Sequence, residues 1–553
     1  MSRKILVTSA LPYANGPLHI GHLRSTYLPA DVFIRYCRLR GYDAIYCCAT
    51  DEHGAPIEIN AAKNGKTPQE FVQIYRKKHS EDFSRFGMSF DEFYYTHSPE
   101  SEQFASEFFL KNKEAGNIYS KSVTLTFCPK CDRFLPDRYV KGECPHCGAS
   151  DQYGDQCEKC GKVYSPADLK KPFCVVCKTP PVKKDTVHYF FKLSAFSSFL
   201  SQWFDSNKKL PSDVTNYLKK WIEEGLQDWD ITRDGPYFGF KIPGEQDKYF
   251  YVWWDAPIGY VASSKHYCDT HNRSFNEFWK DSDAERVHFI GKDIIYHHFL
   301  FWPAMLKGAG YDIPSRIPSR GYLNLEQEKM SKSRGKFLLI SDFLDHYPAD
   351  YLRYYLTAVT PNDTSDGNFS WKEFQAKVNN ELVNVLGNFC FRVLSFLQSK
   401  YGGNVPEPTG YSEDDEKFQQ RLDSLGGELS SSLEEVEIKT AQEKLMAFAA
   451  DCNKYFNDRA PWHLLKNNDK SADAVLFLSA KAVFAIALYG QPFLPFTSKT
   501  LLEQLALPGA SLKWGDLSAL KPGASLPKPT PLYVKIEDEQ IARELGEEAV
   551  EKK

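Results

Sequence analysis

Two histidines near the start of the chain could bind a phosphate group. His19 and His22 stand three residues apart, shortly after an Asn-Gly-Pro turn at 15–17. If a helix begins at about residue 18, with Pro17 near its first position, both imidazoles share one face. They then lie beside backbone N–H groups at the positive end of the helix, which favours anions such as phosphate. Gly21 lacks a Cβ and would let a bulky group approach the backbone. Two unrelated surface histidines are the alternative.

A cluster of positive charge lies far along the chain. Residues 329–335 read Lys-Met-Ser-Lys-Ser-Arg-Gly. Such a loop repels itself when empty and gains order by binding a polyanion such as a triphosphate. Lys329 and Lys332 are its candidate phosphate-binding residues, and a solvated basic loop is the alternative.

Eight of the fourteen cysteines form Cys-x-x-Cys pairs. The pairs are Cys128/Cys131, Cys144/Cys147, Cys157/Cys160 and Cys174/Cys177. Each pair offers two thiolates and structural zinc takes four ligands, so the spacing predicts two four-cysteine zinc sites. Spacing does not decide which pairs share a metal, because sequential and nested pairings differ by roughly a few tenths of a kcal/mol in loop-closure entropy. Redox activity of a single pair is the alternative, although tandem pairs without a βαβ pattern do not favour it.

The elements that must position these groups form an α/β pattern. Residues 5–7 and 44–49 read as buried strands, and the second is followed by Asp51. Ligands bind at the carboxyl edge of such sheets, so Asp51 is expected to face the same crevice as His19. A carboxylate there suits an ammonium group; capping of the next element is the alternative. Polar helices are expected from about 60 to 115.

Further strands and a pocket are expected in the second half. Strands are expected over 188–191 and 287–290. The run 251–260 is apolar, aromatic and rich in turns, which suits a small hydrophobic pocket, with ordinary core as the alternative. The adjacent His297 and His298 lack a third ligand at helical spacing, so a metal site is not favoured there. Beyond residue 370, apolar periodicity over 374–397 and 436–456 predicts a helical domain.

Composition indicates a soluble globular protein. The chain has 553 residues, is 42% hydrophobic and 25% charged, and has a formal net charge of −4. Its length suggests roughly three to four domains. The charge balance argues against a general nucleic-acid coat protein, so RNA binding would come from local patches. We expect no membrane span and no signal or transit peptide, and therefore a cytoplasmic protein.

The two phosphate motifs together resemble the signatures of the class I aminoacyl-tRNA synthetases. Further stretches resemble the methionyl-tRNA synthetase family within that class: residues 10–16, the cysteine insertion, 229–231, 233–234, 251–260, 288–298, 329–335 and 460–462. The resemblance spans residues 5 to about 465. It implies an α/β Rossmann-like catalytic domain with a parallel sheet, a zinc-knuckle insertion and a C-terminal α-helical bundle.

The resemblance also implies an activity. Such enzymes activate L-methionine with ATP and Mg²⁺ to methionyl-adenylate, then transfer the methionyl group to the 3′-terminal ribose of tRNA(Met), for initiation and elongation of translation. A catalytically inactive zinc-knuckle tRNA-binding relative is one alternative. Another nucleotidyl transferase with a similar His-x-Gly-His is a second.

Residue roles follow from the same resemblance. The methionine-binding residues would be Leu11, Tyr13, Asp51, Trp253, Ala256, Pro257, Tyr260, Ile294 and His298. ATP would be bound by His19, Gly21, His22, Asp293 and Lys332, and catalysis assigned to His19, His22, Lys329, Lys332 and Arg233. The CAU anticodon would be read by Asn388, Arg392 and Trp462, with a place in the bundle core as the alternative for Trp462. The implied zinc pairing is nested: Cys144, Cys147, Cys157 and Cys160 in one site, and Cys128, Cys131, Cys174 and Cys177 in the other.

The expected domain boundaries combine the motifs with the family pattern. They are 1–115 for the first half of the catalytic domain, 116–185 for the zinc insertion, 186–325 for the second catalytic half, 326–370 for the basic loop and stem-contact region, 371–508 for the anticodon-binding domain, and 509–553 for a tail. A monomer is expected.

Overall fold

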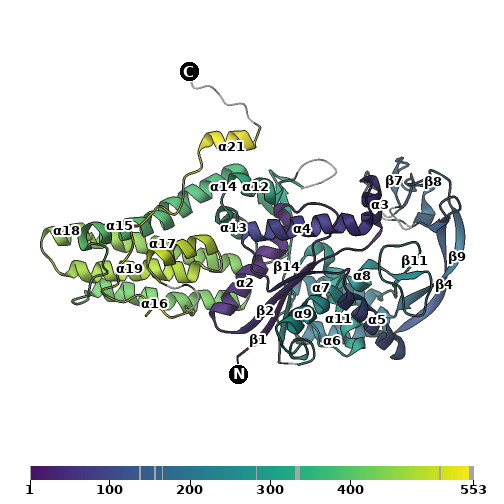
Figure 1. The fold of residues 1–553 in the computed structure, drawn as a ribbon, viewed down its shortest axis with the longest axis horizontal. Helices are drawn as coiled ribbons and strands as arrows, with labels where there is room; N and C mark the ends of the chain where they lie inside the picture. The colour runs from purple at the N-terminus through teal and green to yellow at the C-terminus, as the bar shows by residue number, and fades with distance from the viewer. Residues whose placement is uncertain are drawn as a thin grey trace, which may run out of the picture.

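A central parallel sheet lies between a ribbon-like insertion at one end of the molecule and a helical bundle at the other (Figure 1). The computed structural model describes residues 2–135, 139–154, 157–162, 164, 166–281, 283–329, 337–507, 509 and 512–546. The predicted fold class, a Rossmann-like α/β sheet with a helical C-terminal region, is confirmed.

The central sheet has five parallel strands in the order β14-β13-β1-β2-β3. Their bounds are Lys4–Ser9 (β1), Asp43–Thr50 (β2), Glu92–Tyr95 (β3), Glu285–Gly291 (β13) and Ser319–Arg320 (β14). From the middle of the sheet, β1, β2 and β3 follow one another toward one edge, whereas β13 and β14 follow one another toward the opposite edge. The carboxyl ends of β1 and β13 therefore flank a topological switch point, where ligands bind in such folds.

Alternating side chains of β1 enter two different cores. Ile5 and Val7 belong to the core shared with α2 and α4, whereas Leu6 belongs to the core formed with α5, α9 and α11. The helices are Leu28–Leu39 (α2), Pro68–Phe86 (α4), Pro99–Glu114 (α5), Ile258–Thr270 (α9) and Trp302–Ala309 (α11). Because successive strand residues face opposite sides, helices cover both faces of the sheet.

The first helix begins later than predicted, at Ile20 instead of about residue 18. His19 is extended, with φ −122° and ψ 164°. The N–H of Ile20 donates to the carbonyl of Leu338 (3.0 Å), and the N–H of Ile340 donates to the carbonyl of Leu18 (3.2 Å). This pairing with a distant segment holds residues 18–19 in an extended conformation, which a local turn signal could not reveal.

The polar region from 60 to 115 is helical apart from one strand that the sequence prediction missed. It contains α3 (Ala55–Lys63), α4 and α5, but β3 lies between α4 and α5 as an edge strand of the sheet. The predicted strands at 188–191 and 287–290 are parts of longer strands, Val182–Phe191 (β9) and β13.

The insertion is built on a long antiparallel ribbon. β4 (Ile118–Cys128) pairs with β9 from Ile118 to Phe127, and β10 (Trp229–Asp230) pairs with the end of β9 nearest the central sheet. The cysteines lie at the far end of this ribbon and around a small sheet of β6 (Val140–Glu143), β7 (Gln152–Tyr153) and β8 (Lys170–Cys174).

The predicted helical region forms a bundle. Its helices are Trp371–Lys377 (α14), continued by a π-helical stretch Val378–Gly387, Asn388–Tyr401 (α15), Glu413–Glu434 (α16), Ile438–Arg459 (α17), Pro461–Lys466 (α18), Ser471–Gly490 (α19) and Pro495–Gln504 (α20). The segment after the bundle contacts both the bundle and α2: Trp514 donates its Nε1–H to the carbonyl of Gly426 in α16 (3.0 Å) and its backbone N–H to that of Leu39 in α2 (2.9 Å).

Within the part of the chain that the structure describes, two helical stretches are long and apolar enough to cross a membrane, contrary to the expectation of no such run. They are Trp371–Tyr401 and Ser471–Gly490. In the more apolar window, within α19, 83% of the residues are buried inside the protein, and in the other 44%. Helix α19 is the core helix of the bundle, which accounts for its apolar composition.

Candidate active site

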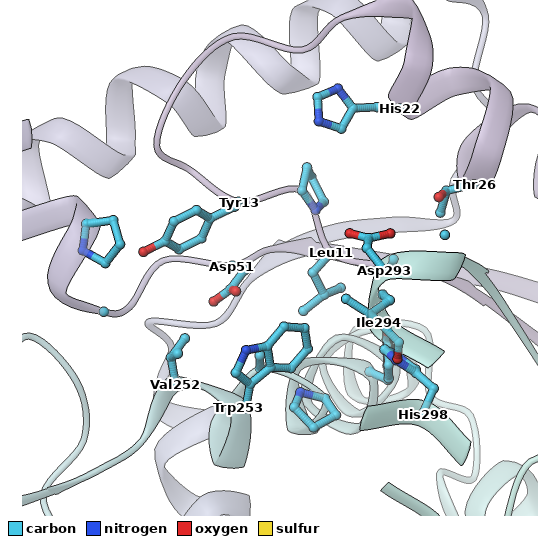
Figure 2. Close-up of a pocket in the computed structure, with 18 of the residues that line it drawn as sticks. Leu11, Tyr13, His22, Thr26, Asp51, Val252, Trp253, Asp293, Ile294 and His298 are labelled. Atoms are coloured by element: carbon cyan, nitrogen blue, oxygen red, sulfur yellow. Dashed lines mark hydrogen bonds between the residues drawn. The ribbon is translucent and has the colours of Figure 1, made fainter. Parts of the chain in front are cut away.

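A cavity of about 500 Å³ lies at the carboxyl ends of β1, β2 and β13 (Figure 2). All nine residues predicted to contact an amino acid line it, together with three of those predicted to act on a nucleotide. They are Leu11, Tyr13, Asp51, Trp253, Ala256, Pro257, Tyr260, Ile294 and His298, with His22, Arg233 and Asp293. His19 and Gly21 are not among the lining residues.

One end of the cavity is apolar and uncharged. His298 Nδ1–H donates to the carbonyl of Ile294 (3.1 Å), so its Nε2 accepts a hydrogen bond from Tyr260 OH (2.8 Å). Burial lowers the pKa of His298 to about 4, so the ring is neutral at physiological pH. Leu11 and Trp253 complete this end (Figure 2). It suits an unbranched, polarizable apolar side chain better than a charged one.

The wall formed by Trp253 is supported from behind by His297. The two rings stack with centroids 3.7 Å apart and an interplanar angle of 10°. Burial lowers the pKa of His297 to about 3, with the neighbouring His298 adding to the effect. His297 is therefore a neutral stacking partner, a role that the sequence analysis, which considered it only as a metal ligand, did not assign.

Asp51 places a carboxylate beside this apolar end. Its backbone is fixed by two hydrogen bonds to the β1 loop, from Asp51 N–H to Pro12 O (2.9 Å) and from Ala14 N–H to Asp51 O (2.8 Å). Its buried Oδ1 has no hydrogen-bond partner among the described residues. Desolvation by burial, then the nearby Asp255, raises the pKa of Asp51 well above its usual range. A carboxylate in such surroundings is suited to binding a cation, such as a ligand ammonium.

The opposite end of the cavity carries groups suited to phosphate. His22 and Thr26 come from the amino-terminal helical segment and lie near Asp293 (Figure 2). The rings of His19 and His22 are 3.8 Å apart, which confirms that they share one face. His22 Nδ1 lies 3.1 Å from the backbone N and 3.2 Å from the carbonyl O of His19, so the backbone holds this side of the ring. The pair can therefore donate hydrogen bonds to an oxyanion.

The predicted contact between Lys332 and these histidines lies outside the described residues, which omit 330–336. Lys329 ends the short strand β16 (Glu328–Lys329), and its side chain is likewise not described. The segment that follows, however, reaches the histidine motif, because His19 and Leu339 form an antiparallel bridge. The backbone of the histidine motif therefore lies beside the segment that directly follows the basic motif.

Arg233 enters the cavity from a different element. It lies in β11 (Thr232–Asp234), and its guanidinium is 3.7 Å from the ring centroid of Tyr251. Its Nη1–H donates to the carbonyl of Thr232 (2.6 Å). Because its guanidinium lines the cavity, Arg233 can contact an anionic group there.

The eight paired cysteines form two quartets in the nested arrangement. Cys128, Cys131, Cys174 and Cys177 form the outer quartet, and Cys144, Cys147, Cys157 and Cys160 the inner quartet. Sulfur–sulfur distances are 3.3 and 3.9 Å in the outer quartet and 3.8 and 3.6 Å in the inner one. A tetrahedron with metal–sulfur bonds of about 2.3 Å has sulfurs about 3.8 Å apart, so both quartets can hold a metal ion.

The three residues predicted to read an anticodon lie near one another at the bundle surface. Asn388 and Arg392 are four residues apart on α15, hence on the same face. The Arg392 guanidinium lies 6.0 Å from the Trp462 ring centroid and donates to Asn457 Oδ1 (2.8 Å). Trp462 is 36% exposed, which argues against the core alternative. Phe391, 37% exposed, is a neighbouring aromatic residue that the sequence analysis missed.

Other cavity residues were also missed. They are Ala10, Pro12, Ser25, Thr26, Tyr27, Gly54, Ala55, Pro56, Tyr237, Tyr251, Val252 and Gly291. Tyr251 and Val252 belong to the aromatic run that was predicted to form a pocket, so that signal was present. Tyr237 and Thr26 carry no local signal, because only the fold brings them to the carboxyl edge of the sheet.

Comparison with known proteins gives one consistent result. The model of the family "tRNA synthetases class I (M)" matches residues 5–394, and that of the "anticodon binding domain of methionyl tRNA ligase" matches residues 405–546. The methionine–tRNA ligase of Methanopyrus kandleri is 43% identical over 98% of this chain and 81% of its own length. That of Methanosphaera stadtmanae is 38% identical over 98% and 82%.

Solved structures with the same fold include methionyl-tRNA synthetase from Mycobacterium tuberculosis. The form bound by methionyl-adenylate is 26% identical, with a TM-score of 0.81 over 96% of this chain and 100% of its own. The free form has a TM-score of 0.74 at 26% identity over 97% and 99%. The similarity therefore extends across the sheet, the insertion and the bundle.

Proposed function

Because the chain belongs to the methionyl family of the class I tRNA synthetases, we propose that it joins L-methionine to tRNA(Met) in two steps at the cavity described above. The methionine carboxylate attacks the α-phosphate of ATP, which gives methionyl-adenylate and pyrophosphate. The terminal ribose 2′-hydroxyl of the tRNA then takes the acyl group, and AMP leaves. No side-chain nucleophile is required, so catalysis consists of positioning and charge stabilisation.

Asp51 is the observation that carries this proposal. Its unpartnered Oδ1 can accept a hydrogen bond from a ligand ammonium group. It lies beside an apolar end of the cavity lined by Leu11, Trp253 and Tyr260. An α-amino acid with an unbranched apolar side chain satisfies both features at once. Its carboxylate would then point toward the phosphate end of the cavity.

The nucleotide half is assigned to the two predicted phosphate motifs. His19 and His22, with the backbone at Gly21, would stabilise the triphosphate from one side, while Lys329 and Lys332 would do so from the other. Asp293 and Arg233 would orient the reacting groups. Mg²⁺ bound to ATP would neutralise part of the phosphate charge. Pairing of 18–20 with 338–340 supports this arrangement.

Two structural zinc ions are proposed for the cysteine quartets. Four thiolates at tetrahedral spacing fit zinc and leave no open position, so these ions would hold the fold and take no part in the reaction. We propose further that the domain boundaries expected from the sequence hold, and that the enzyme acts as a cytoplasmic monomer.

The direct test is methionine-dependent exchange of pyrophosphate into ATP, followed by charging of a tRNA with a CAU anticodon. Both activities are expected. An inactive tRNA-binding relative would show neither, and a different nucleotidyl transferase would exchange pyrophosphate without a requirement for methionine.

Replacement of Trp462 by Ala is expected to weaken tRNA recognition alone. Stacking of a base on an aromatic ring contributes about 1–3 kcal/mol, so kcat/KM for tRNA should fall by about 5- to 150-fold. Pyrophosphate exchange should not change, because Trp462 lies on the bundle, far along the molecule from the cavity (α18 in Figure 1). An equal loss in both assays would contradict anticodon stacking.

A further inference from the structure

A buried cluster of charges lies beneath β11, outside the cavity. His188 of β9 is 1% exposed, and its two ring nitrogens each contact a carboxylate: Nδ1 lies 2.7 Å from Asp230 Oδ2, and Nε2 lies 2.8 Å from Asp234 Oδ2. Because both neighbours are carboxylates, the ring can donate from both nitrogens only as an imidazolium. Burial disfavours that charge, but the two hydrogen bonds outweigh burial and raise the pKa of His188.

The charges of this cluster balance. Asp234 also accepts hydrogen bonds from Lys248 Nζ (2.8 Å) and from Thr186 Oγ1 (2.9 Å). Asp230 Oδ1 accepts the backbone N–H of Thr232 (3.0 Å). Two cations and two carboxylates thus tie β9, β10, β11 and β12 (Lys248–Phe250) together. Each carboxylate oxygen accepts at least one hydrogen bond.

The spacing of the two carboxylates connects this cluster to the cavity. Asp230 and Asp234 lie four residues apart, and Arg233 lies between them. Successive side chains of an extended segment alternate between its two faces. The even-numbered residues 230, 232 and 234 contact β9, because Thr232 also bonds the backbone of Tyr189 (2.8 Å). Arg233 consequently projects from the opposite face, into the cavity and over Tyr251.

We propose that His188 is a positioning residue for Arg233: by holding the carboxylates on both sides of it, the imidazolium fixes the register and direction in which the guanidinium enters the cavity. This inference rests on the proposed function, in which Arg233 orients the reacting groups. His188 itself touches neither substrate and is separated from the cavity by the strand.

Replacement of His188 by Gln tests the proposal. The amide can donate to one carboxylate but cannot bridge both, so the segment 230–234 loses one of the two contacts that His188 makes with it. We expect kcat for pyrophosphate exchange to fall by about 10- to 100-fold, the effect of a misplaced catalytic group. The affinity for methionine without ATP, measured by tryptophan fluorescence, should stay within about twofold, because the apolar end of the cavity does not involve this cluster. A matched loss of methionine binding would indicate general disruption of the fold and overturn the proposal.

A double-mutant cycle with Arg233→Ala supplies a readout that a purely structural role would not move. If His188 acts through Arg233, His188→Gln should lower kcat by less than about twofold when Arg233 is already absent. If the two substitutions lower kcat independently, so that their fold effects multiply in the double variant, the proposal is refuted. The matched control is His266→Gln, since His266 Nδ1 contacts a single carboxylate, Glu92 Oε2 (2.9 Å), away from Arg233. This variant should change neither kcat for pyrophosphate exchange nor the affinity for methionine.

A second variant covers the case in which His188→Gln does not fold. Asp230→Asn keeps the ring and the Asp234 contact but weakens one anchor, and it should show the same selective fall in kcat with a folded melting profile. A folded Asp230→Asn variant with full kcat would overturn the proposal. Absence of exchange in the wild-type enzyme would instead contradict the proposed function and is distinguishable from these outcomes.

Discussion

Replacement of Asp51 by Asn is expected to lower kcat/KM for methionine in pyrophosphate exchange by about 30- to 5,000-fold. Loss of one partner from a buried charge pair costs about 2–5 kcal/mol, and each 1.36 kcal/mol corresponds to a factor of ten. The Asn side chain has nearly the same shape, so the change removes the charge that would hold the substrate ammonium and little else. Fluorescence titration with methionine should show the same loss as a higher Kd.

The same substitution should stabilise the ligand-free protein. The pKa of the Asp51 carboxyl is raised in the folded state by desolvation and by Asp255. A raised acid pKa means that the folded state binds the proton more tightly than the unfolded state does, so stability is lost as the pH rises through the folded pKa. Asn carries no such charge. Tm of the variant should exceed that of the wild type at neutral pH, and the difference should fade as the pH falls.

Asp293→Asn provides the control for this pair of effects. Asp293 also lines the cavity, but at the phosphate end and in an exposed position. The Asp293→Asn variant should bind methionine in the absence of ATP as tightly as the wild type does. If Asp51→Asn binds methionine as tightly as the wild type, or if it lowers Tm at neutral pH, the role given to Asp51 is wrong.

Residues with a strong local signal were placed correctly from the sequence. Asp51 directly follows a buried strand, and His22 belongs to a compact motif, so each could be assigned to the carboxyl edge of the sheet before the fold was known. Trp253 and Tyr260 lie in the aromatic run that was predicted to suit a pocket, and the family resemblance named them individually. The four Cys-x-x-Cys pairs predicted two metal sites by ligand count alone.

Features that depend on contacts distant in sequence were not predicted. The helix starts at Ile20 because residues 338–340 pair with 18–20, and this tertiary pairing overrides the local turn. Strand β3 is short and half-buried, so it carries too little pattern to stand out between two polar helices. Spacing could not choose between the nested and sequential cysteine pairings, since loop-closure entropy barely distinguishes them; the three-dimensional path of the ribbon decides this.

The two cysteine quartets should differ in their importance for activity, because among the described residues only the outer quartet adjoins side chains that connect to the cavity. Tyr139 OH (2.7 Å) and Arg133 Nη2 (3.1 Å) both donate to Glu58 Oε2. Glu58 Oε1 in turn accepts the backbone N–H of Phe238 (2.6 Å), next to the cavity residue Tyr237. The cysteines of the inner quartet instead lie in the connections that follow β6 and β7, within the insertion.

Cys131→Ser in the outer quartet should therefore release one zinc and lower kcat/KM in pyrophosphate exchange by at least about 100-fold. Metal binding supplies folding free energy, so loss of the outer ion should free Arg133 and Tyr139 from Glu58, and a displacement of about 1 Å near the cavity can cost that much. The matched variant Cys147→Ser should release the inner zinc and retain exchange within about threefold. Zinc content by mass spectrometry of the native protein, two ions in the wild type and one in each variant, makes the comparison direct. Equal losses of activity in the two variants would show that the Glu58 contacts do not connect the outer quartet to the cavity.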